Sequence, residues 1–407
     1  MNGKRVFVGL SGGVDSAVSA ALLKKQGYEV VGVFIKTWHP DFLKCNEEEE
    51  RHDAMRVAAF LDIPFLTFDL VDVYKKEVAD YMIREYKAGR TPNPDVMCNK
   101  EVKFGAFLKK ALSMGALVRP LAEIFVATGH YARIEREFPI SNSQFSKKQS
   151  RLKNLNIENS LQIENCKLKI GIDPSKDQSY FLWTLRQEQL KKILFPVGHL
   201  KKTEVRKLAK KFGLPVAEKK DSQGICFLGA VDLKEFLKHY IKEKKGKVLN
   251  EKGEGIGHHN GVVFSTLGER HGFTITKKSP NDNRYYIVGK DLKKNILFVS
   301  QKLAPRLDKE GVGGGNSKNH HLAFGTPPQK GGEVIKLKDT NWISKIPKSN
   351  KNYTAQIRYH GEFLSCKVIC GSKASAKVIF NKPILVASGQ SIVVYNKDIC
   401  LGGGVVK

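Results

Sequence analysis

The first third of the chain alternates short apolar, β-rich runs with helical patterns. The β-rich runs cover residues 6–10, 30–35 and 65–69, and the helical patterns cover residues 17–25, 48–61 and 71–87. This alternation predicts βαβ units and a mainly parallel, doubly wound sheet, so we expect an α/β fold for this region. A further strand over residues 125–128 ends at Gly129 and His130. Ligands of such sheets bind at the carboxyl ends of strands, which makes the segments after Leu10 and after Thr128 the expected site.

The chain is 407 residues long, which exceeds one ordinary core and indicates two or three domains. After about Gly229, a helical stretch at 233–242 and strand runs at 285–288 and 296–299 predict a small β-rich central domain. Strand runs at 353–359, 363–369, 377–380 and 391–395 predict a compact barrel or sandwich. We expect a doubly wound nucleotide-binding domain at 1–228, the central domain at 229–300 and a C-terminal β-barrel domain at 301–407.

Several segments between these elements have a simpler interpretation. Residues 137–166 are rich in Ser, Asn, Gln and Lys and predict a solvated insertion or loop, and residues 305–332 predict a linker or long loop. An amphipathic stretch covers residues 187–193, and a helix at 203–212 is ended by Gly213 and Pro215. The 137–166 segment carries no catalytic pattern, and neither it nor the 305–332 segment interrupts a catalytic string.

The charge of the chain favours a polyanionic partner. Lys and Arg number 69 against 41 Asp and Glu, which gives a formal net charge of +28. Nucleic acid is therefore the leading candidate partner. A basic coat that serves only solubility is the alternative, and charge alone does not exclude it.

The cysteines and the apolar runs bear on the compartment. Seven cysteines, an odd number with only one closely spaced pair, argue against a secreted disulfide scaffold. No run reaches the roughly 18 apolar residues of a membrane span. The residues before Val6 leave no room for a signal peptide. We expect a cytoplasmic protein with no membrane partner.

The most specific local string is Gly9-Leu10-Ser11-Gly12-Gly13-Val14-Asp15-Ser16, between a predicted strand and a predicted helix. Adjacent glycines let the backbone approach a phosphate closely, and a helix beginning near Ser16 offers N–H donors and the positive end of its dipole. The string lacks the Lys of a Walker A loop. It resembles the pyrophosphate-binding loop of the ATP pyrophosphatase superfamily, whose members adenylate a carbonyl oxygen. A glycine-rich turn without a ligand is the alternative.

Two further segments place a cysteine beside a turn. In residues 89–99, Pro92 and Pro94 predict a rigid extended turn that holds Asp95 in a defined relation to Cys98. In residues 221–227, Cys226 follows a polar turn that contains glycine. Taken alone, either cysteine is more often a buried small residue than a nucleophile.

Together these strings resemble the tRNA-specific 2-thiouridylase family, and the likeness covers nearly the whole chain. Further matching strings lie at residues 127–133, 176–182, 198–202, 358–360 and 383–390. The resemblance implies that ATP binds at Gly9–Ser16, with Ile35 and Gly129 on the adenosine side. It also implies that the O2 of the wobble uridine of a tRNA is adenylated and replaced by sulfur, with release of AMP and pyrophosphate. Mg²⁺ would neutralise the charge on the pyrophosphate.

The same resemblance assigns roles to the thiols. Cys226 resembles the persulfide carrier, and Cys98 resembles the second cysteine, which cleaves the persulfide or closes a disulfide with it. Asp95 resembles the acid/base residue. A persulfide donates its outer sulfur only if another thiolate takes the remaining sulfur atom, so two cysteines are needed. Cys98 and Cys226 are far apart in the sequence, so the fold has to bring them together.

The resemblance also implies partners and contacts. The implied tRNA-binding residues are Asn93, Pro94, Asp95, His130, Lys176, Asp177, Gln178, Arg358, Tyr359 and Gln390. The alternatives are a core histidine at His130, a polar turn at 176–178 and a strand surface at 358–359; the net charge favours phosphate contacts. The implied partners are tRNAs for Lys, Glu and Gln, and a cysteine desulfurase or sulfur-relay protein as the sulfur donor.

Other functions and sites remain to be weighed. An amidating ligase of the same superfamily is one rival, and a tRNA-binding module that has lost catalysis is another; paired thiols argue against both. Cys366 and Cys370 have a C-x₃-C spacing without a second ligand pair, so we interpret them as core or edge thiols and not as zinc ligands. The His258–His259 and His320–His321 pairs have no clear metal partners, and we expect no structural metal site.

Overall fold

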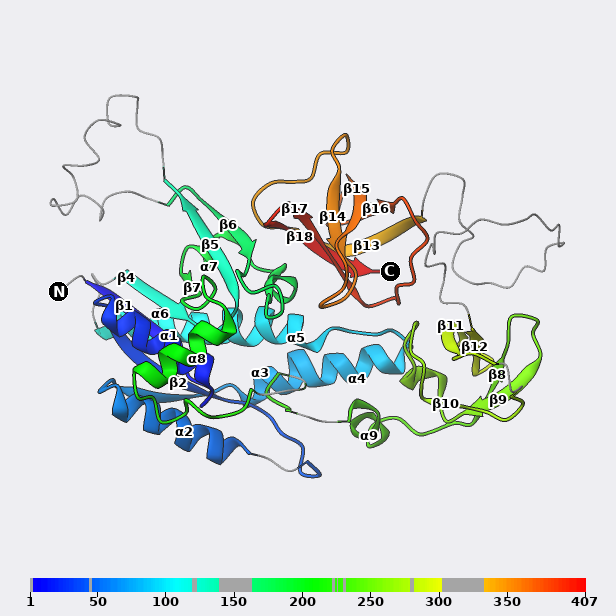
Figure 1. Ribbon diagram of the computed structural model, residues 1–407, viewed down its shortest axis with the longest axis horizontal. Coiled ribbons are helices and arrows are strands. Elements are labelled where there is room, and N and C mark those ends of the chain that lie inside the picture. The colour runs from blue at the N-terminus through cyan, green and yellow to red at the C-terminus, as the bar shows by residue number, and fades with distance from the viewer. Residues whose placement is uncertain are drawn as a thin grey trace.

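The computed structural model describes residues 3–43, 46–118, 123–138, 163–221, 224, 226–229, 232–278, 282–301 and 333–407. In Figure 1 the N-terminal sheet and the central sheet lie at opposite ends of the view, with α4 and α5 between them and the C-terminal barrel above. This arrangement confirms the expected fold class, an α/β domain followed by a small β-rich domain and a β-barrel. None of the helices in the described ranges is both long and apolar enough to cross a membrane.

The N-terminal domain is built on a five-stranded, all-parallel sheet with the order β3-β2-β1-β4-β7. The strands are β1 (Lys4–Gly9), β2 (Glu29–Lys36), β3 (Phe65–Asp69), β4 (Glu123–Ala127) and β7 (Ile193–Leu194). The strand order reverses between β1 and β4. A ligand crevice is therefore expected beside their carboxyl ends.

Both faces of this sheet are buried, which explains why its strands are continuous apolar runs. Val6 and Val8 pack on the side of α1 (Val14–Lys25), α2 (Glu47–Phe60) and α8 (Lys202–Lys211). Phe7 and Val33 point to the opposite side and pack with α4 (Asp80–Lys87) and α6 (Leu108–Val118). The helices thus form a layer on each side of the sheet.

The helices on the second face are not regular α-helices. The helix predicted at 71–87 is interrupted by a π-helical turn, so that α3 (Val71–Tyr74) and α4 are joined by η1 (Lys75–Ala79). The short helix α5 (Pro94–Met97) continues into a ten-residue π-helix, η2 (Cys98–Phe107), and then into α6.

The extended turn predicted for the segment around Pro94 is therefore wrong. Pro94 is the first residue of α5, where its missing N–H costs no hydrogen bond. The Asn93 side chain caps this helix by accepting a hydrogen bond from the Val96 N–H at 3.1 Å. Asp95 and Cys98 are thus held on one continuous helical segment.

The segment between β7 and the central domain contains two further helices. The amphipathic stretch predicted at 187–193 is the short helix α7 (Gln187–Leu190), followed by strand β7. The helix predicted at 203–212 is α8, and it ends before Gly213, whose φ of +67° suits a residue without a side chain.

The central domain contains a five-stranded sheet with the order β10-β9-β8-β12-β11, preceded by α9 (Leu233–Lys238). The strands are β8 (Gly246–Leu249), β9 (Gly255–His259), β10 (Phe273–Ile275), β11 (Tyr286–Asp291) and β12 (Ile296–Ser300). Strands β11 and β12 were predicted. Strands β8 and β9 were missed because glycine, lysine and histidine occupy most of their positions, and β10 is only three residues long.

The C-terminal domain is a closed antiparallel barrel, because β13 pairs with both β16 and β18. Its strands are β13 (Glu333–Trp342), β14 (Tyr353–Gln356), β15 (Leu364–Cys370), β16 (Ala376–Phe380), β17 (Ser391–Asn396) and β18 (Ile399–Val406). The sequence predicted either a barrel or a sandwich, and the closed sheet shows that the domain is a barrel. The glycine-rich β18 and the polar β13 were not predicted.

One hairpin of the N-terminal half joins this barrel. Strands β5 (Ala132–Glu137) and β6 (Asn165–Ile170) pair with each other, and β6 adds to the edge of β18. The interpretation of 137–166 as a loop is therefore wrong at both ends, where Glu137, Asn165 and Cys166 lie in strands. Residues 139–162 between them, and the predicted linker at 305–332, lie outside the described residues.

Candidate functional site

A cavity of about 1220 Å³ opens at the carboxyl ends of β1, β2 and β4. Its lining includes residues of the Gly9–Ser16 string, which we call the phosphate loop. Residues of α5, η2, α9 and the segment at 226–229 complete this part of the lining. The C-terminal barrel contributes Tyr359 and His360. The cavity lies at the strand ends that the sequence predicted for the site.

The phosphate loop lies between β1 and α1, as predicted. The helix begins at Val14, slightly earlier than expected, and its N-cap is Gly13, which has no side chain to cap the first turn. Ser16 closes the loop, because its Oγ accepts from the Ser11 N–H at 3.3 Å and donates to the Gly13 carbonyl at 3.1 Å. The uncapped first turn of α1 offers N–H donors to an anion.

Two glycines allow the loop to pack this closely. A Cβ at Gly12, where φ is +69°, would lie 2.5 Å from the Glu50 carbonyl oxygen. A Cβ at Gly129 would lie 2.8 Å from the backbone of both Asp15 and Ser16. Of the predicted nucleotide-binding residues, those that line the cavity are Gly9, Leu10, Ser11, Gly13, Val14, Asp15, Ser16, Ile35 and Gly129; Gly12 is not among them.

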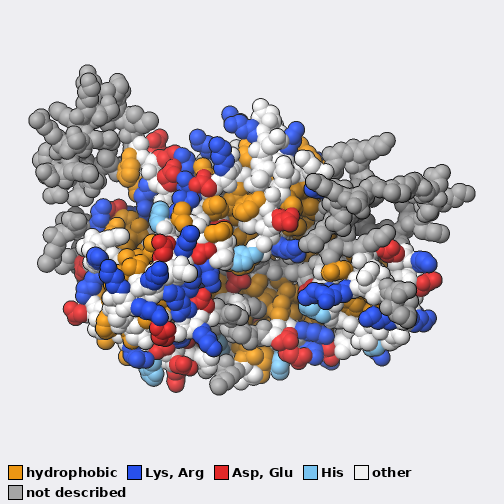
Figure 2. All heavy atoms as spheres, viewed as in Figure 1, with side chains coloured by type: hydrophobic (Ala, Val, Ile, Leu, Met, Phe, Trp, Pro, Cys, Tyr) orange, Lys and Arg blue, Asp and Glu red, His pale blue; other side chains and the backbone are white. Residues whose placement is uncertain are grey.

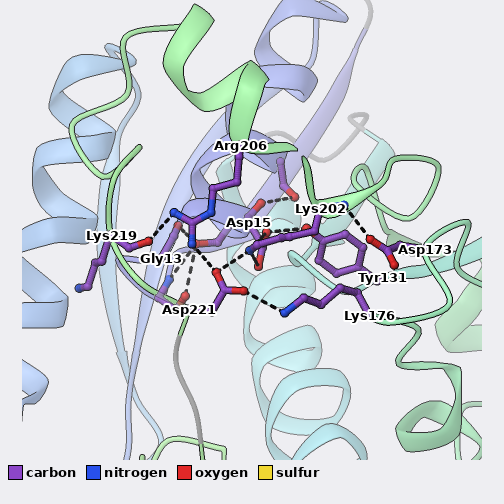
Figure 3. A network of polar contacts seen from close by, with 12 residues as sticks. Gly13, Asp15, Tyr131, Asp173, Lys176, Lys202, Arg206, Lys219 and Asp221 are labelled. Atoms are coloured by element: carbon purple, nitrogen blue, oxygen red, sulfur yellow. Dashed lines mark hydrogen bonds and ion pairs between the residues drawn. The ribbon is translucent and has the colours of Figure 1, made fainter. Parts of the chain in front are cut away.

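A network of charged side chains connects the phosphate loop to the segment that carries Cys226 (Figure 3). The Lys202 ammonium contacts both carboxylate oxygens of Asp15, at 2.7 and 2.8 Å, and also lies 2.9 Å from Asp221. The Tyr131 hydroxyl donates to Asp15 at 2.7 Å. Lys202 therefore connects the phosphate loop to Asp221, the first residue of the 221–227 segment.

Asp221 also contacts two further cationic side chains of this network. Arg206 contacts it at 2.6 Å and Lys176 at 2.9 Å. Burial opposes its ionisation, but the hydrogen bonds from Lys202 and Lys176 hold the pKa of Asp221 well below its usual range. Asp221 is thus an anion at any physiological pH.

The two predicted cysteines meet in the cavity region. The Cys98 thiol is fully buried, and its sulfur lies 3.3 Å from that of the half-buried Cys226. This distance corresponds to a thiol hydrogen bond and exceeds the length of a disulfide bond. The fold thus brings together the two thiols that are far apart in the sequence.

Two side chains fix the backbone of Cys226. Its N–H donates to Asp95 Oδ1 at 3.0 Å, and its carbonyl accepts from the Tyr74 hydroxyl at 2.7 Å. The next carbonyl, that of Phe227, is 2.8 Å from His39 Nε2. These contacts hold Cys226 from both the α3 and the α5 sides.

The surroundings of the two thiols shift their pKa values in opposite directions. The hydrogen bond from Cys98 is the main factor that lowers the pKa of Cys226 to about 7; burial opposes it and Lys103 adds to it. Burial, followed by the contact with Cys226, raises the pKa of Cys98 well above its ordinary value. Burial also raises the pKa of Asp95. Near neutral pH, a large fraction of Cys226 is therefore thiolate, whereas Cys98 is the protonated donor.

Lys103 is a site residue that the sequence interpretation missed. It lines the cavity, and its ammonium lies 5.5 Å from the centre of the Phe227 ring. Burial favours the neutral amine, but the nearby Cys226 and Cys98 raise the pKa of Lys103 above its ordinary value. A π-helix is not visible in a hydrophobic pattern, so the only available signal was a lysine close to Cys98 in sequence.

The predicted tRNA-binding residues divide into two groups. Asp95, His130, Lys176, Gln178 and Tyr359 line the cavity, where Tyr359 packs against Phe181 with 4.3 Å between ring centres. The other predicted residues, Asn93, Pro94, Asp177, Arg358 and Gln390, are not in its lining.

Several residues of these groups already have intramolecular partners. His130 is buried between Phe104 and Phe195 and hydrogen-bonds Thr128 at 2.7 Å. Asp177 accepts from the Gly171 N–H, and Gln178 accepts from the Tyr131 N–H at 3.0 Å. These contacts match the core-histidine and polar-turn alternatives, whereas Arg358 is exposed.

The basic residues are spread over the face of the molecule that Figure 2 shows. Figure 2 shows Lys and Arg side chains over the N-terminal domain, the barrel and the central domain, with acidic side chains between them. In the described parts of the chain, no group of three or more His, Cys, Asp or Glu residues is arranged to hold a metal ion. Some residues of the segments considered from the sequence lie outside the described residues: Ser222, Gln223, Ile225, His320 and His321.

Three family models match consecutive parts of the chain. They are described as the tRNA methyl transferase HUP domain over residues 4–230, the tRNA methyl transferase PRC-barrel domain over 234–301 and the aminomethyltransferase beta-barrel domain over 333–406. Together they cover the parallel sheet, the central sheet and the barrel.

Curated relatives match the chain along its whole length. A protein of Geobacillus thermodenitrificans named tRNA-specific 2-thiouridylase MnmA is 40% identical over 99% of this chain and 94% of its own. Proteins of the same name from Listeria monocytogenes and Streptococcus mutans are 38% and 39% identical, over 99% of this chain and 94% and 95% of their own. These matches confirm the resemblance found in the sequence. The chain belongs to the tRNA-specific 2-thiouridylase family.

Proposed function

We propose that this chain is an ATP-dependent sulfurtransferase that converts the wobble uridine of tRNA to 2-thiouridine. One observation carries the proposal: the sulfur atoms of Cys98 and Cys226 are 3.3 Å apart beside a cavity that the phosphate loop also lines. Paired thiols serve sulfur transfer, and a phosphate cradle serves activation by ATP. The names of the relatives support the same reaction.

The cradle fits the polyphosphate of ATP. The uncapped first turn of α1 supplies N–H donors, and Gly12 and Gly129 keep side chains out of the loop's packing contacts. Mg²⁺ fits as well, because it is commonly bound by one or two carboxylates together with substrate phosphates, and Asp15 supplies a carboxylate here. When bound, Mg²⁺ would neutralise charge that develops on the departing pyrophosphate.

The first chemical step activates the base. The uridine O2 attacks the α-phosphate of ATP, pyrophosphate leaves, and the oxygen becomes part of a good leaving group. We assign the accompanying proton transfer to Asp95, which lines the cavity and has a pKa raised by burial. Lys202 and the N–H groups of α1 hold the phosphates in this scheme.

The second step transfers sulfur. Cys226, the more acidic thiol, accepts a sulfane sulfur from a cysteine desulfurase or a relay protein and becomes a persulfide. The outer sulfur attacks C2 and AMP leaves. Cys98 then attacks the Cys226 sulfur and its thiol proton passes to the departing 2-thiouridine, so that thiouridine is released and a Cys98–Cys226 disulfide forms. A thiol reductant must supply two electrons to restore both thiols before the next turnover.

We extend the proposal to the domains and the substrate. Residues 1–228 bind ATP and hold the thiols, residues 229–300 form the central domain and residues 301–407 bind tRNA. The net charge of +28 supports a polyanionic substrate, and Tyr359 brings the barrel to the cavity. The tRNAs for Lys, Glu and Gln are the proposed acceptors.

Mass spectrometry of nucleosides tests this function. The purified protein is incubated with ATP, a sulfur donor and unmodified tRNA, and 2-thiouridine is expected together with AMP and pyrophosphate. A methylated nucleoside, as the descriptions of two family models would suggest, would contradict the proposal. ATP consumption that needs ammonia and not tRNA would indicate the amidating ligase. Binding of tRNA without ATP consumption would indicate a module that has lost catalysis.

Labelled sulfur tests the two cysteine roles. Cys226→Ser should accept no label but should still form the adenylated tRNA, whereas Cys98→Ser should accept the label and stall. Cys370→Ser on β15 is the matched control and should turn over normally. Label that remains on Cys226→Ser and disappears from Cys98→Ser would reverse the roles.

A further inference from the structure

We infer that Lys103 is a further catalytic residue, whose ammonium group keeps Cys226 in the thiolate form, and that the π-helix η2 is the element that positions it. The use of this thiolate as a sulfur acceptor rests on the proposed function. The interaction between the two side chains does not, and it can be tested on the free protein.

The π-helix explains how Lys103 reaches the thiols. A π-helix bonds residue i to residue i+5, so residues five apart lie close to one another on the same side of the helix. Cys98 is the first residue of η2, and Lys103 follows it at this spacing. In an α-helix, the same spacing would turn Lys103 roughly 140° away from Cys98. The widened helix therefore puts a cation and a thiol on one face.

The π-helix has a glycine, Gly105, at a position that leaves little room for a side chain. A Cβ at Gly105 would lie 2.8 Å from the carbonyl oxygen of Lys100, five residues earlier in the same helix. Real Cβ atoms essentially never come this close to a backbone oxygen. A glycine thus stands where a Cβ atom would come too close to the carbonyl oxygen of the preceding turn.

The groups that face Cys226 come from three elements. Cys98 and Lys103 belong to η2, Asp95 belongs to α5, and Tyr74 of α3 hydrogen-bonds the Cys226 carbonyl. Cys98 hydrogen-bonds the Cys226 sulfur, Lys103 stabilises its negative charge, and Asp95 opposes that charge. Nearby His130 stays neutral, because burial and then Lys103 lower its pKa well below the ordinary value. Lys103 is the cation among these groups, and it adds to the Cys98 hydrogen bond in offsetting Asp95 and the cost of burial.

The test measures alkylation of Cys226 by iodoacetamide between pH 5 and pH 10, without ATP or tRNA, and assigns the site by peptide mass spectrometry. The unchanged protein should show a midpoint near pH 7, where the Cys226 thiolate forms. Lys103→Met should move the midpoint upward by about one unit or more, which is roughly tenfold slower alkylation at neutral pH. Lys103→Gln is the second neutral variant and should behave alike.

Two controls separate charge from structure. Lys103→Arg keeps a cation and should retain a midpoint close to that of the unchanged protein. Lys100→Met removes an exposed lysine of the same helix and should leave the profile unchanged. An unchanged profile in folded Lys103→Met, or an equal shift in Lys103→Arg or Lys100→Met, would overturn the inference.

The same experiment separates this inference from the proposed function. If Lys103→Met shifts the alkylation profile and the unchanged protein makes no 2-thiouridine, the inference stands and the function fails. If 2-thiouridine forms and the profile does not shift, the function stands and the inference fails.

Discussion

The backbone N–H of Cys226 donates a hydrogen bond to Asp95 Oδ1 at 3.0 Å, and this bond ties the 221–227 segment to the helix that carries Cys98. Asp95 and Cys98 lie on one continuous helical run, so this bond holds the Cys226 backbone close to the turn that carries Cys98. Together with the hydrogen bond between the two sulfur atoms, this side chain holds the two parts of the sequence beside each other.

We expect Asp95→Ala to slow formation of the Cys98–Cys226 disulfide under a mild oxidant. A hydrogen bond to a charged group contributes about 1.5–3 kcal/mol, and its loss should slow closure by roughly tenfold or more. Because Asp95 also opposes the Cys226 thiolate, the disulfide rate should be divided by the alkylation rate of Cys226. Asp95→Asn retains an acceptor oxygen and is the control. Equal normalised rates in the alanine variant would contradict this role.

Lys202 bridges Asp15 and Asp221, and we expect this bridge to contribute to ATP affinity. Lys202→Met leaves two carboxylates at the cradle without their common cation, at the position where the polyphosphate is proposed to bind. ATP affinity should fall by roughly tenfold, the effect of one charged hydrogen bond, while tRNA affinity should change little. Calorimetry with ATP and a gel-shift assay with tRNA measure the two. Lys207→Met, on the exposed side of α8, should change neither, and a loss confined to tRNA would argue against the placement of the cradle.

Gly129 predicts a steric effect on the same loop. In Gly129→Ala the new methyl group would lie 2.8 Å from the backbone at Asp15 and Ser16, so the phosphate loop has to shift. Overpacking of this kind costs about 1–3 kcal/mol, and ATP binding should weaken by roughly tenfold or more. Gly255→Ala on β9 meets no atom closer than 3.9 Å and is the control. Unchanged ATP binding in Gly129→Ala would show that the cradle tolerates the displacement or is not used.

The parts of the site that depend on local order were predictable from the sequence. The phosphate loop follows from glycines between an apolar run and a helical pattern, and the structure has it between β1 and α1. The need for two cysteines followed from persulfide chemistry. Their contact did not, because it depends on how a segment after α8 packs on a helix far earlier in the chain.

The missed features have identifiable physical causes. Lys103 was missed because apolar periodicity does not distinguish an α-helix from a π-helix, and only the latter puts this lysine beside Cys98. The addition of β6 to β18 was missed because pairing between distant strands leaves no local signal. Pro94 was taken for part of an extended turn, although proline also suits the first position of a helix.

Salt dependence tests the electrostatic contribution to tRNA binding. The net charge of +28 implies that Lys and Arg contact phosphates and release counterions on binding. Affinity should fall steeply between low and physiological salt, with a linear relation between log affinity and log salt concentration. Filter binding at several salt concentrations gives the slope, and ATP binding in the absence of tRNA is the comparison. A flat response would remove the electrostatic interpretation of the basic composition.

We expect Lys290 to make the stability of the central domain depend on pH. This domain contacts the N-terminal domain where the Thr266 hydroxyl lies 3.2 Å from that of Thr91. The Lys290 ammonium donates to the Ser265 carbonyl at 2.9 Å, and burial lowers its pKa from 10.5 to about 8. Between these two values the unfolded chain binds more protons than the folded one, so stability should rise with pH from about 8 to 10.5. Lys290→Met should abolish this rise and stabilise the domain at neutral pH by at most roughly 3 kcal/mol, the value that corresponds to the pKa difference. Amide exchange of β11 peptides, corrected for the intrinsic rate at each pH, measures the effect, and exposed Lys247→Met on β8 should retain the rise. A rise that persists in Lys290→Met would assign the pH dependence to another group.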